Sequence, residues 1–419
     1  MRIDQKYLDI PARRNEFPAL SREHMGFPLA YFDGPGGTQV PQSVIDAIVS
    51  YYCTCNSNTH GFFITTNESD RIIEETREAV AVFLGATGGK NISFGHNMTT
   101  LNYSLSRAIG KTLLPGDEIL ITQLDHEANR GPWLALRDEG VVVREVRLLP
   151  DGTLDYEDFD EKIGENTRLV AMGFSSNAIG TVNDVKKVRA MTHRVGALLL
   201  VDAVHYAPHF PIDVNELGLD FLLCSAYKFY GPHIGLLYSR EGLLDRLPVF
   251  TLRTQEQHAP YSIETGTLNH AAIAGVKAAV EFIATFGSGG SYREKIFSGM
   301  NRIGEYEHIL GKEIYDGLKK IPGVEIVGTP FGSGRVPTVS FTMEGMDPID
   351  VCKLLDTRGI CAWDGHFYGI RPIEVLGLLE KGGVTRVGVS LYNTTEEVQR
   401  LLDAVSDISS GILKLEKLQ

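Results

Sequence analysis

The sequence predicts an α/β fold in which a mainly parallel, seven-stranded sheet is followed by a smaller α+β layer. Seven short apolar runs lie between residues 92 and 240, helical patterns separate most of them, and Asp202 and Lys228 close two of the runs. Apolar runs bounded by Gly and Pro are typical of strands buried on both faces, and alternation with helices indicates a parallel sheet. Ionisable residues at strand ends lie where such sheets bind ligands.

Composition narrows the class of protein. The 419 residues are enough for two or three domains. The chain has 40 Lys and Arg against 53 Asp and Glu, so we expect no nucleic-acid or anionic-membrane partner. The N-terminus is charged, and no apolar run is long enough to span a membrane, so we expect a cytoplasmic protein. Five cysteines without a CxxC pair indicate reduced thiols, and the sequence predicts no metal site.

The first part of the chain contains an arm, two helices and the strands of the large sheet. Residues 1–30 form a polar arm, and a glycine-rich turn at 34–37 precedes a helix that begins near Pro41. Residues 51–67 lack periodicity and are predicted to be a loop, while helical spacing returns over 69–84. The seven predicted strands cover 92–94, 118–121, 141–146, 168–174, 197–203, 221–227 and 235–240.

The stretch 287–291, GSGGS, is the clearest break in composition. It predicts a division into the arm 1–30, a large domain 31–287 and a small domain 288–419. In the small domain we expect a long helix over 292–320 and strands over 324–327, 338–342, 359–362 and 386–391. Thr394 and Glu397 form a capping box that predicts the start of the last helix.

Asp202 and Lys228 have the residue types that pyridoxal phosphate requires: a lysine amine for an internal aldimine and a carboxylate against the pyridine nitrogen. Taken singly, Lys228 is also compatible with a lysine whose stem packs at a strand end, and Asp202 with a turn cap. Their surroundings, DAVH, SAYK and GPHIG, resemble class V aminotransferases, the group that contains cysteine desulfurases and selenocysteine lyases. This resemblance implies a fold type I pyridoxal-phosphate enzyme whose large sheet has one antiparallel strand.

The resemblance also implies roles for other residues around the cofactor. Lys228, His126 and Asp202 would be catalytic, with His126 stacking on the ring and Asn177 bonding the ring hydroxyl. His205 stands where desulfurases usually carry Gln. A helix N-terminus is a ready site for a phosphate, and the implied phosphate ligands are Met98, Thr99, Ser225, Tyr227 and, from the other subunit of an obligate homodimer, Thr267.

Three further residues are expected at the substrate. Arg386 matches the family's arginine that holds the α-carboxylate of a small amino acid, and a guanidinium suits this task because it binds a carboxylate through two parallel hydrogen bonds. His60 resembles a residue that borders the substrate pocket. Trp363 belongs to a loop that in desulfurases carries an arginine and, five residues later, the nucleophilic cysteine.

In this sequence Trp363 stands at the position of that arginine, and Tyr368 stands at the position of the nucleophilic cysteine. Tyrosine forms no persulfide, and Cys361 is more typical of a buried small apolar residue. We therefore expect β-elimination at a C–S or C–Se bond rather than persulfide formation. The alternatives are an amino-acid epimerase, racemase or aminotransferase of the same superfamily and, outside catalysis, a scaffold that binds pyridoxal phosphate.

Overall fold

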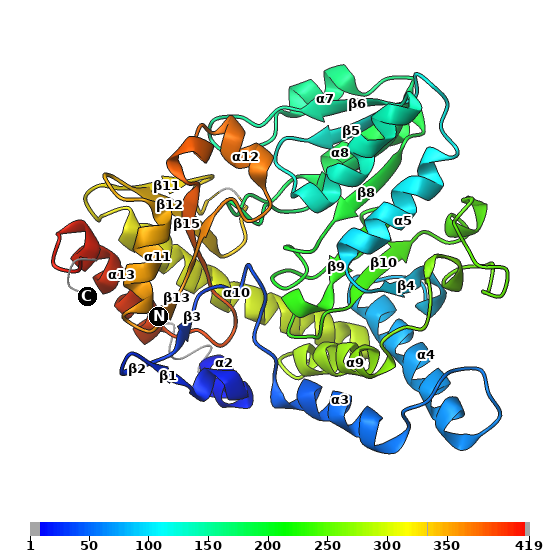
Figure 1. Ribbon diagram of the computed structural model, residues 1–419, viewed down its shortest axis with the longest axis horizontal. Helices are drawn as coiled ribbons and strands as arrows, with labels where there is room; N and C mark the ends of the chain where they lie inside the picture. The colour runs from blue at the N-terminus through cyan, green and yellow to red at the C-terminus, as the bar shows by residue number, and fades with distance from the viewer. Residues whose placement is uncertain (1–8, 333, 415–419) are drawn as a thin grey trace.

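The computed structural model describes residues 9–332 and 334–414, so residues 1–8 of the predicted arm lie outside the described part. A large sheet with its helices occupies one side of the molecule, and a smaller sheet with its helices lies beside it (Figure 1). The predicted α/β architecture is confirmed. Within the described ranges no helix combines the length and the apolar content needed to cross a membrane.

All seven predicted strands form one sheet, in the order β4-β10-β9-β8-β7-β5-β6. β10 pairs antiparallel with both neighbours and the other pairs are parallel, so the implied single antiparallel strand is present. The strands are β4 (Ile92–Gly95), β5 (Glu118–Thr122), β6 (Val142–Val146), β7 (Thr167–Gly173), β8 (Leu198–Asp202), β9 (Phe221–Ser225) and β10 (Gly235–Ser239).

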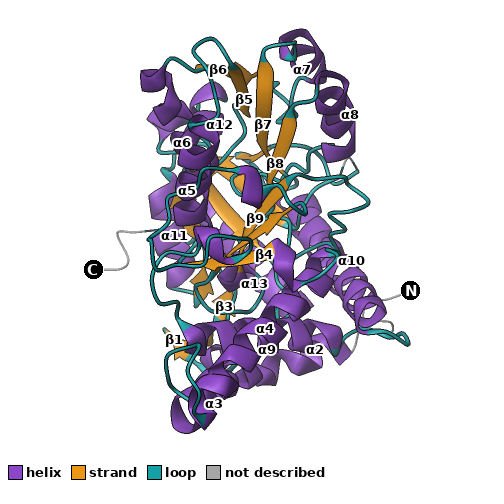
Figure 2. Ribbon diagram, turned by 90° about the vertical axis from the view of Figure 1, so that its right-hand side faces the viewer, coloured by secondary structure: helices purple, strands orange, loops and turns teal. Residues whose placement is uncertain are grey.

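Both faces of this sheet are packed, which explains the uninterrupted apolar runs. In β8, Leu199 and Val201 belong to one hydrophobic core and Leu200 to the core on the other face. Figure 2 shows α5 and α6 on one side of the strands and α7 and α8 on the other. The helices of this part are α3 (Gln42–Thr54), α4 (Ile64–Leu84), α5 (Met98–Gly110), α6 (Gly131–Leu134), α7 (Tyr156–Lys162), α8 (Val185–Val195) and α9 (His270–Ala284).

Two predicted boundaries in this part are wrong. The loop expected over 51–67 is shorter, because α3 continues to Thr54 and α4 begins at Ile64. At these helix ends some buried positions are polar and are satisfied by hydrogen bonds, such as that between the hydroxyls of Tyr51 and Ser69 at 2.8 Å. The helical spacing of apolar residues is therefore not visible in the sequence there. The strand expected over 221–227 ends at Ser225, and Lys228 closes a short 3-10 helix, where the chain turns toward a cavity.

The second sheet is antiparallel, with the order β11-β12-β15-β14. Its strands are β11 (Val324–Val327), β12 (Thr338–Met343), β14 (Trp363–Gly365) and β15 (Val384–Gly388). Its helices are α10 (Tyr292–Leu318), α11 (Pro348–Asp356), α12 (Ile370–Val375) and α13 (Thr395–Ser409). The capping box of Thr394 with Glu397 opens α13 as predicted. β14 was not predicted, and the strand expected over 386–391 begins two residues and ends three residues earlier, at Val384–Gly388.

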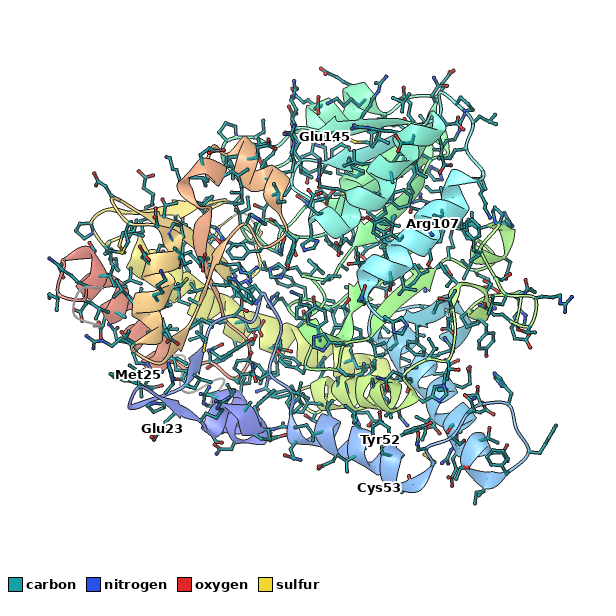
Figure 3. All side chains as sticks on the ribbon, viewed as in Figure 1. Glu23, Met25, Tyr52, Cys53, Arg107 and Glu145 are labelled. Atoms are coloured by element: carbon teal, nitrogen blue, oxygen red, sulfur yellow. The ribbon has the colours of Figure 1, made fainter. Side chains whose placement is uncertain are left out.

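The N-terminal segment packs against the C-terminal layer. It contains α2 (Asp9–Ala12), a small hairpin of β1 (Glu23–His24) with β2 (Phe27–Pro28), and β3 (Ala30–Tyr31). The strand expected over 359–362 is reduced to β13 (Ile360–Cys361), which pairs with β3 instead of joining the second sheet. The division at 30/31 and 287/288 remains a prediction. All five cysteines are free, and Cys53 is exposed on the outer side of α3 (Figure 3).

Candidate active site

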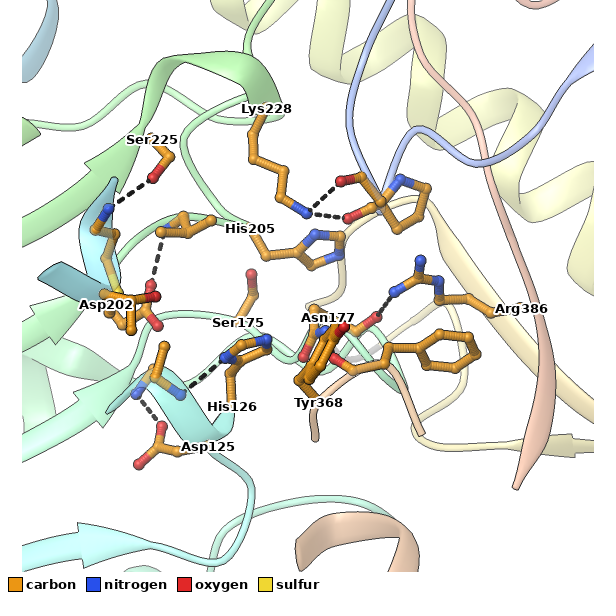
Figure 4. A pocket seen from close by; sticks show the side chains of 18 of the residues that line it. Asp125, His126, Ser175, Asn177, Asp202, His205, Ser225, Lys228, Tyr368 and Arg386 are labelled. Atoms are coloured by element: carbon orange, nitrogen blue, oxygen red, sulfur yellow. Dashed lines mark hydrogen bonds between the residues drawn. The ribbon is translucent and has the colours of Figure 1, made fainter. Parts of the chain in front are cut away.

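A cavity of about 440 Å³ lies at the carboxyl ends of β5, β7, β8 and β9 and is bounded on its other side by residues of the C-terminal layer (Figure 4). It brings together most of the residues predicted from the sequence. Those that line it are Met98, Thr99, His126, Asn177, Asp202, His205, Ser225, Tyr227, Lys228, Trp363 and Arg386. Parallel strands bring polar residues from distant sequence positions to one edge of the sheet.

Lys228 extends its side chain into this cavity from the turn after β9. Its amine donates hydrogen bonds to the carbonyl oxygens of Pro35 and, at 3.0 Å, Gly36. Burial lowers the pKa of Lys228 to about 7, and the positive charge of Arg386 adds to this effect. The amine is therefore a nucleophile and a base near neutral pH.

Asp202 ends β8 and is 8% exposed. Its Oδ1 accepts a hydrogen bond from the amide of Val204 at 2.9 Å. Burial, together with the neighbouring carboxylate of Asp125, raises the pKa of Asp202 to about 7. A buried carboxylate held only by a backbone amide suits a cationic or N–H partner in the cavity, such as a protonated pyridine nitrogen.

His126 lies just after β5, at the start of a 3-10 turn. Its Nδ1 accepts a hydrogen bond from the amide of Ala128 at 3.0 Å, which assigns the ring proton to Nε2. Burial lowers the pKa of His126 to about 4. The imidazole is therefore neutral, as a ring that stacks on an electron-poor heterocycle should be. The ring of Tyr368 lies 5.9 Å away, between centroids.

The start of α5 lies on the side of the cavity that carries Ser225. Asn97 caps this helix by accepting from the amide of Thr100 at 2.9 Å, and the amide of Met98 donates to Ser225 Oγ at 3.1 Å. Gly235 permits this approach, because a Cβ there would lie 2.3 Å from the carbonyl carbon of Asn97. A helix start with a hydroxyl beside it suits a phosphate. Ser225 and Arg386 lie on opposite sides of the cavity (Figure 4).

Arg386 is buried in β15. Its Nη2 is 2.8 Å from Asp33 Oδ1, its Nη1 donates to the carbonyl of Asn177 at 3.1 Å, and its Cζ lies 3.9 Å from the ring centroid of Phe367. The side-chain amide of Asn177 donates to the backbone carbonyl of Phe367 at 2.9 Å. Sequence reasoning missed Asp33 and Phe367. The strand-like YFD segment before the glycine turn was the available signal for Asp33.

The loop after β14 closes the cavity with aromatic side chains. Phe367 and Tyr368 both have left-handed backbones, with φ of 52° and 57°. This conformation is uncommon for bulky residues and is held here by tertiary contacts. The carbonyl of Phe367 accepts from the side chain of Asn177, and the carbonyl of Tyr368 accepts from the backbone amide of Glu127 at 2.8 Å. Trp363 and Tyr368 remain 56% and 72% exposed at the mouth.

Two predicted residues do not line this cavity. His60 lies on the α3–α4 loop with an exposed side chain, and its Nδ1 is 3.5 Å from Asp70. Thr267 is exposed in the segment before α9. Both stay predictions, and Thr267 was expected to serve another subunit's site.

The polar lining fits pyridoxal phosphate. Ser175 Oγ, His205 Nδ1 and Arg386 Nε are buried without a hydrogen-bond partner, and all three residues line this cavity. An unsatisfied buried polar group costs about 1–3 kcal/mol, so three of them around one space favour a polar ligand. His205 Nε2 is fixed 3.0 Å from Thr338 Oγ1. Within the described ranges, no group of three His, Cys, Asp or Glu is placed to hold a metal ion.

Comparison with known proteins agrees with this geometry. Residues 30–401 match the family model described as aminotransferase class-V. The chain is 35% identical to a probable cysteine desulfurase of Mycolicibacterium paratuberculosis, covering 98% of this chain but 60% of that protein. It is 32% identical to a cysteine desulfurase of Serratia proteamaculans, covering 97% of this chain and 98% of the relative. The solved cysteine desulfurase of Thermococcus onnurineus superposes with a TM-score of 0.85 at 28% identity, over 96% of this chain and 98% of that chain.

Proposed function

Because the chain belongs to the aminotransferase class-V family, as a cysteine-desulfurase-like enzyme that depends on pyridoxal phosphate, we propose that it cleaves the C–S or C–Se bond of a small amino acid by β-elimination. The observation that carries this proposal is the content of the cavity. Lys228, Asp202, His126 and Arg386 line it together, whereas none of its described lining residues is a cysteine.

Several groups would hold the cofactor. Asp202 would face its ring nitrogen and His126 its ring, while Ser225 and the start of α5 would take its phosphate. The bound cofactor supplies an electron-withdrawing ring that accepts the electron pair left when the α-proton is removed. The unpartnered Nδ1 of His205 is a further contact available to it.

The protein's own groups then perform the remaining tasks. Arg386 binds the substrate carboxylate, and Phe367 covers the guanidinium face and excludes water from that contact. Lys228 takes the α-proton, which its lowered pKa of about 7 allows. When the C–S bond breaks, its electron pair leaves with sulfur as sulfide. Addition of one water to the three-carbon remainder yields pyruvate and ammonia, so no oxidant or sulfur acceptor is required.

Persulfide formation would need a thiol beside the substrate. Tyr368 lies at the cavity mouth, where the family resemblance would place that thiol. Cys361 lies in β13 and pairs with Tyr31, away from the cavity lining. Burial raises the pKa of the Cys361 thiol, which disfavours the reactive thiolate. These observations support release of sulfide into solution.

The test is to incubate the holoenzyme with L-cysteine, L-cystine and L-selenocysteine and to measure sulfide or selenide, pyruvate and alanine. Elimination yields pyruvate in equal amount to the released sulfide or selenide, or to the cysteine persulfide released from cystine, whereas desulfuration yields alanine. Lys228→Ala is the inactive control. Absence of turnover with all three would refute the lyase assignment. Exchange of the α-hydrogen with deuterium, without elimination, would identify an epimerase or racemase, and a keto acid formed without sulfide an aminotransferase.

A second experiment changes the loop that carries Phe367 and Tyr368. Tyr368→Cys places a thiol where the family's nucleophile is expected, so we expect this variant to carry a persulfide after reaction with L-cysteine, detected as a mass increase of one sulfur. The unaltered chain should carry none. A persulfide on Cys361 of the unaltered chain would contradict the proposal.

We also propose a homodimer in which Thr267 completes the partner's phosphate site. Thr267 is exposed and does not line its own cavity, which agrees with this role. Light scattering measures the molar mass in solution, which should be that of two chains. Mixing Lys228→Ala subunits with Thr267→Val subunits should create one intact site in each heterodimer and restore activity, while mixing either variant with itself should not.

A further inference from the structure

The turn at residues 33–37 lies between the two cationic groups of the site. On one side the carboxylate of Asp33 is 2.8 Å from Arg386 Nη2. On the other side the carbonyls of Pro35 and Gly36 accept from the Lys228 amine. Asp33 is 7% exposed and does not line the cavity, so its carboxylate lies behind the guanidinium. Arg386 thus has a counter-ion supplied by the protein itself, from outside the lining of the cavity.

The turn is attached to both layers of the protein. The carbonyl of Asp33 accepts from the amides of Gly36 and Gly37, at 3.0 and 3.1 Å, which closes the turn. Gly388 lies in the same strand as Arg386, and its backbone amide donates to the carbonyl oxygen of Phe32 at 2.7 Å. The position of the Asp33 carboxylate is therefore set by the same strand that carries the arginine.

Gly36 makes room for this carboxylate. A Cβ at position 36 would lie 2.1 Å from Asp33 Oδ2, far inside van der Waals contact. Any side chain there would displace the Asp33 carboxylate from the position in which it contacts Arg386. The absence of a side chain at position 36 is therefore a requirement of the ion pair rather than of the turn alone.

We propose that Asp33 is a specificity-determining residue that lowers the affinity of Arg386 for carboxylates and restricts the substrate to amino acids with one carboxylate and an uncharged side chain. This rests on the proposed function, in which Arg386 binds the substrate carboxylate. A buried guanidinium without a counter-ion would bind an incoming carboxylate tightly, because the ligand would be its only partner. With Asp33 in place, the incoming carboxylate shares Arg386 with a like charge. A second substrate carboxylate would add to that repulsion, and Asp202 and Asp364 of the cavity would repel it as well.

The test compares Asp33→Asn with the unaltered holoenzyme. Asn keeps an oxygen that accepts from Arg386 but removes the charge. We expect the dissociation constant of propanoate, followed by the visible spectrum of the cofactor, to fall at least about 10-fold, and the KM for L-cysteine to fall by a similar factor, which is the size of one hydrogen bond to a charged group. The kcat should change far less than KM. L-aspartate should bind more tightly to the variant as well.

Asp158→Asn is the matched control. Asp158 is also buried and ion-paired, to Lys162 at 2.7 Å, but lies outside the cavity. The Asp158→Asn variant should be less stable than the unaltered protein but should not bind propanoate more tightly. This result would distinguish an effect of the Asp33 charge on Arg386 from a general effect of losing a buried ion pair. If Asp33→Asn fails to fold, Gly36→Ala, which displaces the Asp33 carboxylate, should also tighten propanoate binding. Gly164→Ala, where a Cβ meets no atom within 4 Å, is its control.

The outcomes separate two failures. If Arg386→Gln binds propanoate as well as the unaltered protein, Arg386 is not the carboxylate site, and that part of the proposed function fails. If Arg386→Gln loses propanoate while Asp33→Asn binds it within twofold of normal, or more weakly, only the assignment of Asp33 is overturned.

Discussion

The reactivity of Lys228 should depend on pH with a midpoint far below that of an ordinary lysine. Burial, with a contribution from Arg386, lowers its pKa from 10.5 to about 7. At pH 7 about half of the amine is then neutral, against roughly one part in 3,000 for a pKa of 10.5, a gain of about 10³-fold in reactive amine. Attachment of pyridoxal phosphate to the cofactor-free protein should follow that fraction.

The assay adds pyridoxal phosphate to cofactor-free protein between pH 5.5 and 9.5, quenches with borohydride at short times and quantifies the labelled Lys228 peptide by mass spectrometry. The rate should rise through pH 7 and level off above it. Lys186 is the internal control, because it is exposed and its pKa is raised by Glu216. Arg386→Gln removes the positive charge that helps to lower the pKa of Lys228, so the midpoint of the labelling rate should move to higher pH. A midpoint above pH 9 in the unaltered protein would refute the reasoning.

The same shift has a consequence for stability, whose sign follows from linkage. Between pH 7 and 10.5 the unfolded chain keeps the Lys228 proton and the folded chain loses it, so the unfolding free energy rises with pH across this window. The full difference of 3.5 pH units corresponds to about 5 kcal/mol. Subtracting the pH profile of Lys228→Met from that of the cofactor-free protein isolates this contribution. A flat difference would contradict the lowered pKa.

Three further changes test other parts of the site and the fold. Asp202→Asn should keep the cofactor but lower kcat roughly 10²-fold, because an amide supplies no negative charge to the ring nitrogen; steady-state rates at matched cofactor content measure this. Asn177→Ala removes the side-chain bond to the aromatic loop and should lower the unfolding free energy by about 1 kcal/mol in urea. Glu264→Gln breaks a buried bidentate pair with Arg77 and should cost about 3–5 kcal/mol, whereas Glu216→Gln at an exposed pair should cost under about 1 kcal/mol.

Local pattern was enough to predict the large sheet and the residues at its strand ends. A strand buried on both faces requires a continuous apolar run, and a polar residue that ends it is visible in the sequence. Asp202, which ends β8, was found in this way, and so was Lys228, although its strand ends at Ser225 and Lys228 closes the 3-10 helix that follows. The family resemblance added His126, Asn177 and Arg386, all of which line one cavity.

Contacts between distant segments were decided by tertiary packing alone. Asp33 and Arg386 are 353 residues apart and meet because Asp33 forms an isolated parallel bridge with Gly388, at the end of β15. The cavity excludes His60 and Thr267, although each lies in a motif that pointed to a site. An ion pair of this kind leaves no periodic trace in either segment, since its free energy comes from burial and geometry that exist only after the two layers have packed.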